Sequence, residues 1–196
     1  TLHEFPDRQL LAEDVIIGEF PENFLSSHRV RSTATYMGDG AFGAATQRSI
    51  VMLTFADCLC QDNQIIEEWL VRDQAGIALQ LGLDPVQHGK TMGLENPENY
   101  TIGNEAFTKR WDAPEGLTIV GNEKVANRIM QTYDAIWNAK NLNIMDEDYD
   151  RAIRFEGPTK ELHYGRYPTS NFINSLLASI PDGRYEPHHV IVKEEP

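Results

Sequence analysis

The sequence predicts an α+β protein in which a strand-rich part comes first and a helix-rich part follows. Up to residue 72, short runs of β-branched residues alternate with turn residues, as is typical of antiparallel strands. Between residues 122 and 180, apolar residues recur at helical spacing. The stretch between these parts is polar and contains several prolines and glycines. We therefore divide the chain into a strand-rich part at 1–85, a linker at 86–121 and a helical part at 122–196.

The first part is expected to form four strands followed by one short helix. The strands are expected at 13–19, 24–37, 48–60 and 64–73. Asp62 and Asn63 separate the last two, which predicts a hairpin with a tight turn. From Asp73 the apolar spacing becomes helical, with Asp73 placed as the N-cap and Gly82 near the C-terminus of the helix.

The second part is expected to be mainly helical. Helices are expected at 121–143, 143–149 and 169–183, and short strands at 151–158 and 185–195. The apolar stripe of the first helix consists of Val125, Ile129, Met130, Tyr133, Ile136 and Trp137. Residues 84–117 show no sustained period, so a long loop or an interdomain linker is expected there.

The two ends of the chain carry a similar pattern. At an offset of 175 positions, seven of 21 residues are identical, among them Pro6 with Pro181. Such a likeness is expected if the chain begins and ends in the middle of a repeated module. Residues 1–85 would then form the back of one module and residues 122–196 the front of the next.

The composition argues against several classes of partner and site. The formal net charge of −13 disfavours a nucleic-acid partner, because phosphate backbones are bound by clustered Lys and Arg. No run approaches the roughly 18 apolar residues of a membrane span, so no membrane partner is expected. Cys58 and Cys60 would share one face of a strand, poorly aimed for a disulfide, and we interpret them as core residues in a reducing, cytoplasmic compartment. No Cys or His cluster predicts a metal site.

Several motifs resemble one protein family. They are Trp137-Asn138, Gly157-Pro158, Gly165-Arg166 and Pro181-Asp182 in the helical part, and Gly38, Gly43 and the run NQIIEEWLVRDQAGIALQLG in the strand-rich part. The two pieces, about four fifths of the chain, resemble the SnoaL-like polyketide cyclases of the nuclear transport factor 2-like (cystatin-like) superfamily. The resemblance implies a cone-shaped, curved antiparallel sheet wrapped by helices. The halves stand in the reverse of the order found in one ordinary module.

The reversed order allows three explanations. The chain is a truncated piece of a tandem protein, a circular permutant that completes one cone, or one of two chains that exchange halves. We favour packing of both halves into a cone, within or between chains, because either half alone leaves one face of its elements uncovered. The resemblance also implies a homodimer or a half-exchanged oligomer, since the outer face of such a sheet commonly packs on a copy of itself.

The resemblance implies a general base at Asp73. In the family, an Asp at the end of the final strand removes a proton next to a carbonyl group, without metal or cofactor, and Asp73 occupies the matching position. Desolvation raises the pKa of such a carboxylate into a useful range. The alternative is that Asp73 only caps the following helix. Strand periodicity places Glu67 and Trp69 on the same face as Asp73, where they are expected to line a substrate pocket.

The remaining candidate residues come from both parts of the chain. Where many family members carry a His, this chain carries Tyr36, which can donate a hydrogen bond but cannot shuttle protons near neutral pH. His28 lies at an even offset from Tyr36, so both are expected on one side of the strand. From the helical part, the resemblance implies that Trp137 and Asn138 line the mouth of the cone, and Tyr133 and Phe155 are expected as apolar lining or core.

Two functions of different class follow. The first is a cofactor-free acid–base isomerase or cyclase that acts on a small, apolar, polyketide-like carbonyl compound with Asp73 as base. The alternative is a non-catalytic small-ligand-binding or dimerisation module, since one fold hosts many functions. An Asp73→Asn substitution separates them, because an enzyme would lose turnover whereas a binding protein would keep its ligand affinity.

Overall fold

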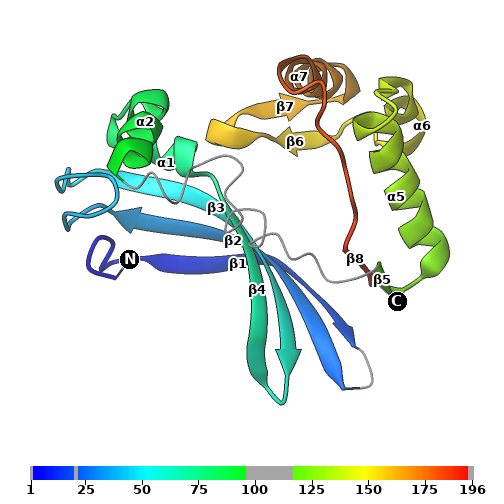
Figure 1. Cartoon of the computed structure of the whole chain (residues 1–196), viewed down its shortest axis with the longest axis horizontal. Helices are drawn as coiled ribbons and strands as arrows, with labels where there is room; N and C mark the ends of the chain where they lie inside the picture. The colour runs from blue at the N-terminus through cyan, green and yellow to red at the C-terminus, as the bar shows by residue number, and fades with distance from the viewer. Residues whose placement is uncertain (1, 20–21, 96–116, 194–196) are drawn as a thin grey trace. The chain divides into compact units, whose positions relative to one another are not determined.

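The computed structural model describes residues 2–19, 22–95 and 117–193. The chain divides into two compact units. The first comprises Thr1–Ile16 and Glu22–Pro114, and the second comprises Ile17–Pro21 and Glu115–Pro196. The first unit contains the main sheet except for the last residues of its first strand, and the second contains most of the helical residues that the structure describes (Figure 1). The α+β class expected from the sequence is therefore confirmed, and no closed barrel is formed within the described residues.

The first unit is built on a four-stranded sheet with the order β1-β2-β3-β4. Its strands are β1 (Gln9–Glu19), β2 (Asn23–Thr35), β3 (Ser49–Gln61) and β4 (Gln64–Arg72). Strands β2, β3 and β4 pair antiparallel. The two-residue loop Asp62–Asn63 joins β3 to β4, and both of its residues have positive φ, at 50° and 60°. That conformation is typical of the type I′ turn, so the predicted hairpin is confirmed.

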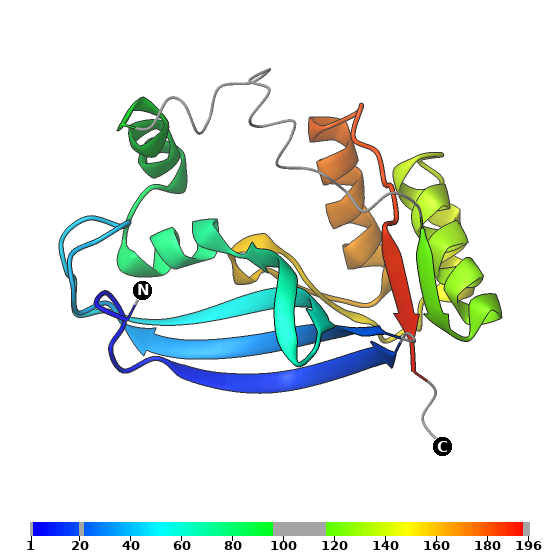
Figure 2. The same cartoon turned by 60° about the horizontal axis from the view of Figure 1, so that its bottom comes forward.

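Helix α1 (Gln74–Leu81) covers one face of this sheet (Figure 2). The core contains Phe5, Ala34, Tyr36, Phe42, Ile50 and Met52, together with Ile77, Ala78 and Leu81 of the helix. Gln80 connects α1 to the sheet: its side chain accepts from the Val51 amide at 2.8 Å and donates to the Val51 carbonyl at 2.9 Å. The end of the helix is marked by Gly82 at φ 85°, as its sequence position predicts.

A second helix, α2 (Pro85–Glu95), lies where the sequence indicated an unstructured loop. That expectation is wrong for these eleven residues. The helix has a start signal: Asp84 accepts from the Val86 amide at 2.8 Å, and Pro85 occupies the first turn. It lacks an apolar stripe, because Gly89 and Gly93 interrupt it and none of its residues is buried. Periodicity alone therefore could not detect it.

The second unit packs three helices around a small core. Its elements are β5 (Thr118–Gly121), α5 (Glu123–Trp137), η1 (Leu142–Ile144), α6 (Met145–Asp148), β6 (Arg154–Glu156), η2 (Pro158–Lys160), β7 (Leu162–Tyr164), α7 (Arg166–Ser179) and β8 (His189–Val192). Ile136, Met145, Ile173 and Leu177 form the core. Strands β5 and β8 pair in parallel, and β6 and β7 pair antiparallel. The expected helices and the strands at β6 and β8 are confirmed, whereas β5 and β7 were not anticipated.

Only part of the expected apolar stripe of α5 is buried. Ile136 is fully buried, but Val125, Ile129 and Tyr133 are 41%, 39% and 40% exposed. Ala126 takes the inward position instead, at 0% exposure. The stripe derived from spacing alone is therefore wider than the face that α5 buries.

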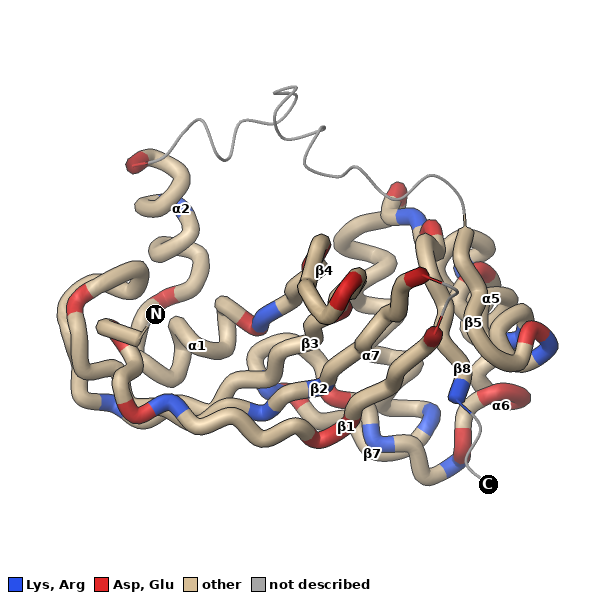
Figure 3. Tube along the Cα trace, turned by 90° about the horizontal axis from the view of Figure 1, so that it is seen from below, with Lys and Arg blue, Asp and Glu red and all other residues tan. Residues whose placement is uncertain are grey.

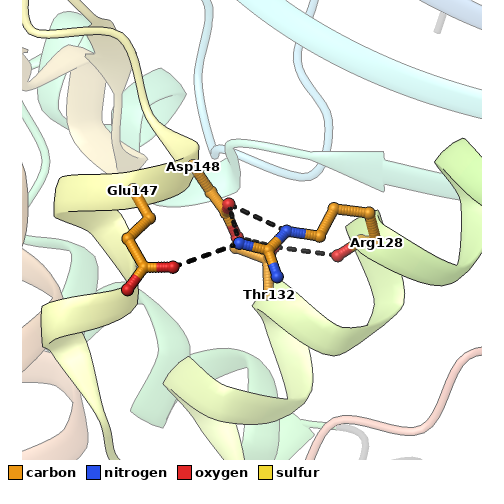
Figure 4. A network of polar contacts seen from close by, with 4 residues as sticks. All are labelled: Arg128, Thr132, Glu147 and Asp148. Carbon is orange, nitrogen blue, oxygen red and sulfur yellow. Dashed lines mark hydrogen bonds and ion pairs between the residues drawn. The ribbon is translucent and has the colours of Figure 1, made fainter.

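An ion-pair network joins α5 to α6 within the second unit (Figure 4). The Arg128 Nε donates to Asp148 Oδ1 at 2.9 Å, and its Nη2 lies 3.4 Å from Glu147 Oε2. The Thr132 hydroxyl donates to the other oxygen of Asp148. The Thr132 hydrogen bond, followed by the Arg128 guanidinium, lowers the pKa of the Asp148 carboxyl below its ordinary value. The network therefore attaches the short helix α6 to the long one.

Charged residues of both signs occur along both units (Figure 3). Among the described residues, no helix has the length and apolar character needed to cross a membrane. Cys58 and Cys60 are buried and form no disulfide with each other, as expected for small core residues.

Candidate functional site

Asp73 stands between β4 and α1 and caps the helix. Its Oδ1 accepts a hydrogen bond from the Gly76 amide at 2.8 Å, and its side chain is half-buried. Gly76 is buried directly against this carboxylate, and a Cβ built there would lie 2.2 Å from Asp73 Oδ2. The capping role expected from the sequence is therefore confirmed. It uses one carboxylate oxygen, and no hydrogen bond to Oδ2 is seen among the described residues.

Tyr36 belongs to the core of the first unit. Its side chain is fully buried, and its hydroxyl donates to the Gly43 carbonyl at 2.6 Å. The ring centroid lies 5.2 Å from that of Phe5 and 6.1 Å from that of Phe42, edge to face with the latter. Burial raises the pKa of the hydroxyl above its ordinary value. From the sequence, the Tyr36 hydroxyl was expected to donate a hydrogen bond to a substrate. In the structure it donates to a backbone carbonyl of the protein instead.

His28 lies on β2 and contacts a neighbouring serine. Its Nε2 is 2.6 Å from the Ser26 Oγ, and the ring is half-buried. The strand register pairs His28 with Ala56 of β3. His28 shares the face of β2 that carries Ala34 and continues toward Tyr36, as its even offset predicts. The structure does not bring its ring into contact with that of Tyr36.

Trp69 and Glu67 lie on the opposite face of the sheet from the core. Strand β4 pairs Trp69 with Asp57 and Glu68 with Cys58. Cys58 belongs to the buried face of β3, so Glu68 shares that face, and its Oε1 lies 3.9 Å from the Cys58 Sγ. Trp69 and Glu67 point the other way because side chains alternate along a strand. Asp73 has left the strand, so its direction does not follow from that alternation.

Asn138 at the end of α5 has a structural contact set. Its amide nitrogen donates to Asp134 Oδ1 at 2.8 Å and to the Tyr185 carbonyl at 3.0 Å. Its amide oxygen accepts from the Tyr185 backbone nitrogen at 2.8 Å. The ring of Tyr133 lies beside that of Tyr185, with the two centroids 5.4 Å apart. Trp137 packs on the core of the unit. Asn138 and Tyr133 therefore hold the segment after α7 against α5.

Phe155 on β6 belongs to an aromatic cluster with α7. Its ring centroid lies 5.6 Å from Phe172 and 6.2 Å from His163, and the latter two are 4.6 Å apart. Gly157 permits this packing, since a Cβ there would come within 3.1 Å of the Phe172 ring. Apolar packing is thus the observed environment of Phe155.

A cavity of about 450 Å³ lies between α1, α2 and the loop before β3. Its lining is mainly apolar and includes Ala41, Phe42, Ala75, Ala78, His88 and Met92. The His88 ring stacks on Phe42, with centroids 5.2 Å apart and planes inclined by 20°. The His88 Nε2 is buried and has no hydrogen-bond partner among the described residues. Sequence analysis missed this cavity because one of its walls is the unanticipated helix α2.

Comparisons with known proteins add little to this geometry. Neither the known protein families nor the curated proteins contain a match to the chain. Among solved structures, the crystal structure of AclR, a proposed hydroxylase from Streptomyces galilaeus, is similar over 51% of this chain, with 19% identity and a TM-score of 0.37. The match covers 66% of the AclR chain, which is just under two thirds of its length. The SnoaL-like resemblance therefore stays a prediction.

The chemistry available at these places is limited. In the described part of the chain, no three His, Cys, Asp or Glu side chains are grouped so that they could hold a metal ion. Asp73 offers one carboxylate oxygen beyond its capping bond, and His88, in the wall of an apolar cavity, has a buried ring nitrogen without a hydrogen-bond partner among the described residues. The first feature suits proton abstraction, and the second suits orientation of a bound molecule by a single hydrogen bond.

Proposed function

We propose that the chain binds a small, largely apolar molecule in the cavity between α1 and α2. The observation that carries this proposal is the combination of an apolar wall with the buried, unpartnered His88 Nε2. Ligand pockets of this size are mostly apolar and use a few polar groups to set orientation. A ligand carbonyl or hydroxyl would provide the hydrogen bond that His88 lacks. This is the non-catalytic alternative expected from the sequence.

The hydrogen bonds that two of the three expected catalytic residues, Tyr36 and Asp73, form within the protein support this choice. The Tyr36 hydroxyl is hydrogen-bonded to a backbone carbonyl, and Asp73 is hydrogen-bonded to the first turn of α1. The Tyr36 contact would have to break, or be shared, before its hydroxyl could act on a substrate, whereas the Asp73 cap occupies only one of the two carboxylate oxygens.

Binding can be tested with the neutral fluorescent probe N-phenyl-1-naphthylamine. Wild-type protein should enhance its fluorescence in a saturable manner, and Ala75→Phe should weaken binding by at least about tenfold because the new ring fills the cavity. Leu79→Phe is the matched control: it adds the same ring to the same helix, at a position that is 49% exposed and outside the cavity lining. Equal binding by a folded Ala75→Phe variant would refute the proposal.

A second candidate function is the acid–base isomerase or cyclase with Asp73 as general base. The uncommitted Asp73 Oδ2 favours it, since capping needs only one oxygen of the carboxylate. The test is deuterium uptake next to the carbonyl of a small apolar ketone such as acetophenone, followed by proton NMR in heavy water. Asp73→Asn keeps the cap but loses the base, so it should abolish any catalysed exchange. Exchange that persists in the variant would eliminate Asp73 as the base.

We also propose that the two units are the two halves of a SnoaL-like cone, within one chain or between two. The motifs quoted from the sequence support this, and so does an exposed apolar pair on the sheet: Phe55 and Val71 face each other in the register and are 47% and 68% exposed. Such a pair suits packing on a second copy of the chain. Light scattering after size exclusion tests the dimer. A monomer that unfolds in two separate transitions would contradict both a dimer and a single cone.

A further inference from the structure

Two arginine side chains of the first unit lie at one place on the sheet without a carboxylate partner. Arg8 immediately precedes β1, and Arg72 is the last residue of β4. Both are half-buried. Neither forms an ion pair within the described residues, whereas Arg29, Arg31 and Arg128 all do. Partly buried arginines usually have an anionic partner, because the protein removes part of their hydration.

The strand register brings these arginines to the same face. Arg72 pairs directly with Thr54 of β3, so both side chains leave the sheet on one side. Ser32 of β2 pairs with Met52, two residues from Thr54 along the same face. The Arg8 Nη2 donates to the Ser32 Oγ at 3.4 Å. Arg8 therefore reaches across β2 toward the pair formed by Thr54 and Arg72.

Three polar atoms of this cluster have no hydrogen-bond partner among the described residues. They are the Arg8 Nε, the Arg72 Nε and the Thr54 Oγ1, and all three are buried. Thr54 is only 4% exposed. Unsatisfied buried groups destabilise a fold, so several unpartnered donors on one face of the sheet indicate a missing acceptor.

The charge of the cluster indicates what kind of acceptor is missing. Burial and the nearby Arg72 lower the pKa of the Arg8 guanidinium, in that order of importance. An anion between the two guanidinium groups would offset both effects and would accept from all three unsatisfied donors. The neighbouring side chains on this face, Val30 and Leu70, are apolar. They suit an aliphatic tail and do not suit a second charged group.

We propose that Arg8, Thr54 and Arg72 form a binding site for the carboxylate of a small molecule that carries an apolar tail. The planar guanidinium fork matches a carboxylate in a bidentate manner, and the Thr54 hydroxyl donates to one of its oxygens. The site shares no residue with the cavity between α1 and α2. A failed test of one proposal therefore leaves the other untouched.

The test uses hexanoate as probe and isothermal titration calorimetry of the full chain. Wild-type protein should bind hexanoate at least about tenfold more tightly than hexanamide, which has the same tail but no charge. Arg72→Met and Arg8→Met should each weaken hexanoate binding by about tenfold or more. Arg48→Met is the matched control, because Arg48 is exposed and lies in the same unit away from this cluster.

A further variant, Thr54→Val, tests the site even if the arginine variants misfold. Thr54→Val keeps the shape of the side chain and removes an unsatisfied hydroxyl, so it should leave unfolding temperature unchanged or raise it. It should nevertheless weaken hexanoate binding several-fold. Equal binding of hexanoate and hexanamide, undiminished binding by Thr54→Val, or tighter binding of inorganic phosphate than of hexanoate would each overturn the proposal.

Discussion

Two substitutions of Asp73 distinguish the contribution of its capping hydrogen bond to stability from the contribution of its negative charge. Asp73→Ala removes the acceptor of the Gly76 amide, which is buried and has no other partner among the described residues. Loss of an N-cap typically costs about 1 kcal/mol, within a range of roughly 0.5–2. Because Gly76 is buried, we expect that water does not replace the carboxylate as the acceptor of its amide. The loss should therefore lie in the upper half of that range, at about 1.5 kcal/mol.

This loss is large enough to detect by thermal unfolding. For a unit of about 100 residues, 1.5 kcal/mol corresponds to a decrease in Tm of roughly 6–10 °C. Differential scanning calorimetry of Asp73→Ala and Asp73→Asn measures it. Asparagine is also a good N-cap, so Asp73→Asn should stay within about 0.5 kcal/mol of wild type.

Each alternative outcome has a distinct meaning. If Asp73→Ala is as stable as wild type, the Gly76 hydrogen bond does not hold α1 and the capping argument is refuted. If Asp73→Asn loses as much as Asp73→Ala, the charge rather than the hydrogen bond stabilises this region. The matched control is Asp84→Ala, which removes the cap of α2; we expect a smaller loss there because α2 has no buried residues.

Three further outcomes are expected. Tyr36→Phe should destabilise the first unit by about 0.5–1.5 kcal/mol in urea unfolding, because the fully buried side chain loses its hydrogen bond to the Gly43 carbonyl, which still accepts from the Gly40 amide. Ile136→Ala, at a fully buried position, should cost about 2–5 kcal/mol, measured in the same way. The pKa of Asp148 is lowered on folding, so its stabilising contribution is present above about pH 4 and is lost as the pH falls below that value. The Tm difference between wild type and Asp148→Asn should therefore shrink between about pH 6 and pH 3, and a constant difference would contradict the assignment.

Features that depend on neighbouring residues could be predicted from the sequence. The Asp62–Asn63 turn, the cap of α1 at Asp73 and the end of that helix at Gly82 all occur as expected. Each is set by residues within about four positions of one another, through turn geometry or a local hydrogen bond. The buried pair Cys58 and Cys60 likewise follows from the alternation of side chains along one strand.

The surroundings of the candidate residues required the tertiary structure. Tyr36 was expected to face a substrate, but the chain folds so that the Gly43 carbonyl accepts from its hydroxyl. The helix α2 has a start signal without an apolar stripe, and the cavity next to His88 exists only because that helix packs near α1.

The sequence by itself determined the four strands of the main sheet, the long helices of the second unit, the hairpin and the helix cap, because these depend on local geometry and on periodicity. Only the tertiary structure decided that Arg8, Thr54 and Arg72 share one face of a sheet. These residues are far apart in the sequence, and strand pairing brings them together. A shift of one residue in the register would turn Thr54 or Arg72 to the other face of the sheet. Long-range register, which no local pattern encodes, therefore set the chemistry of this surface.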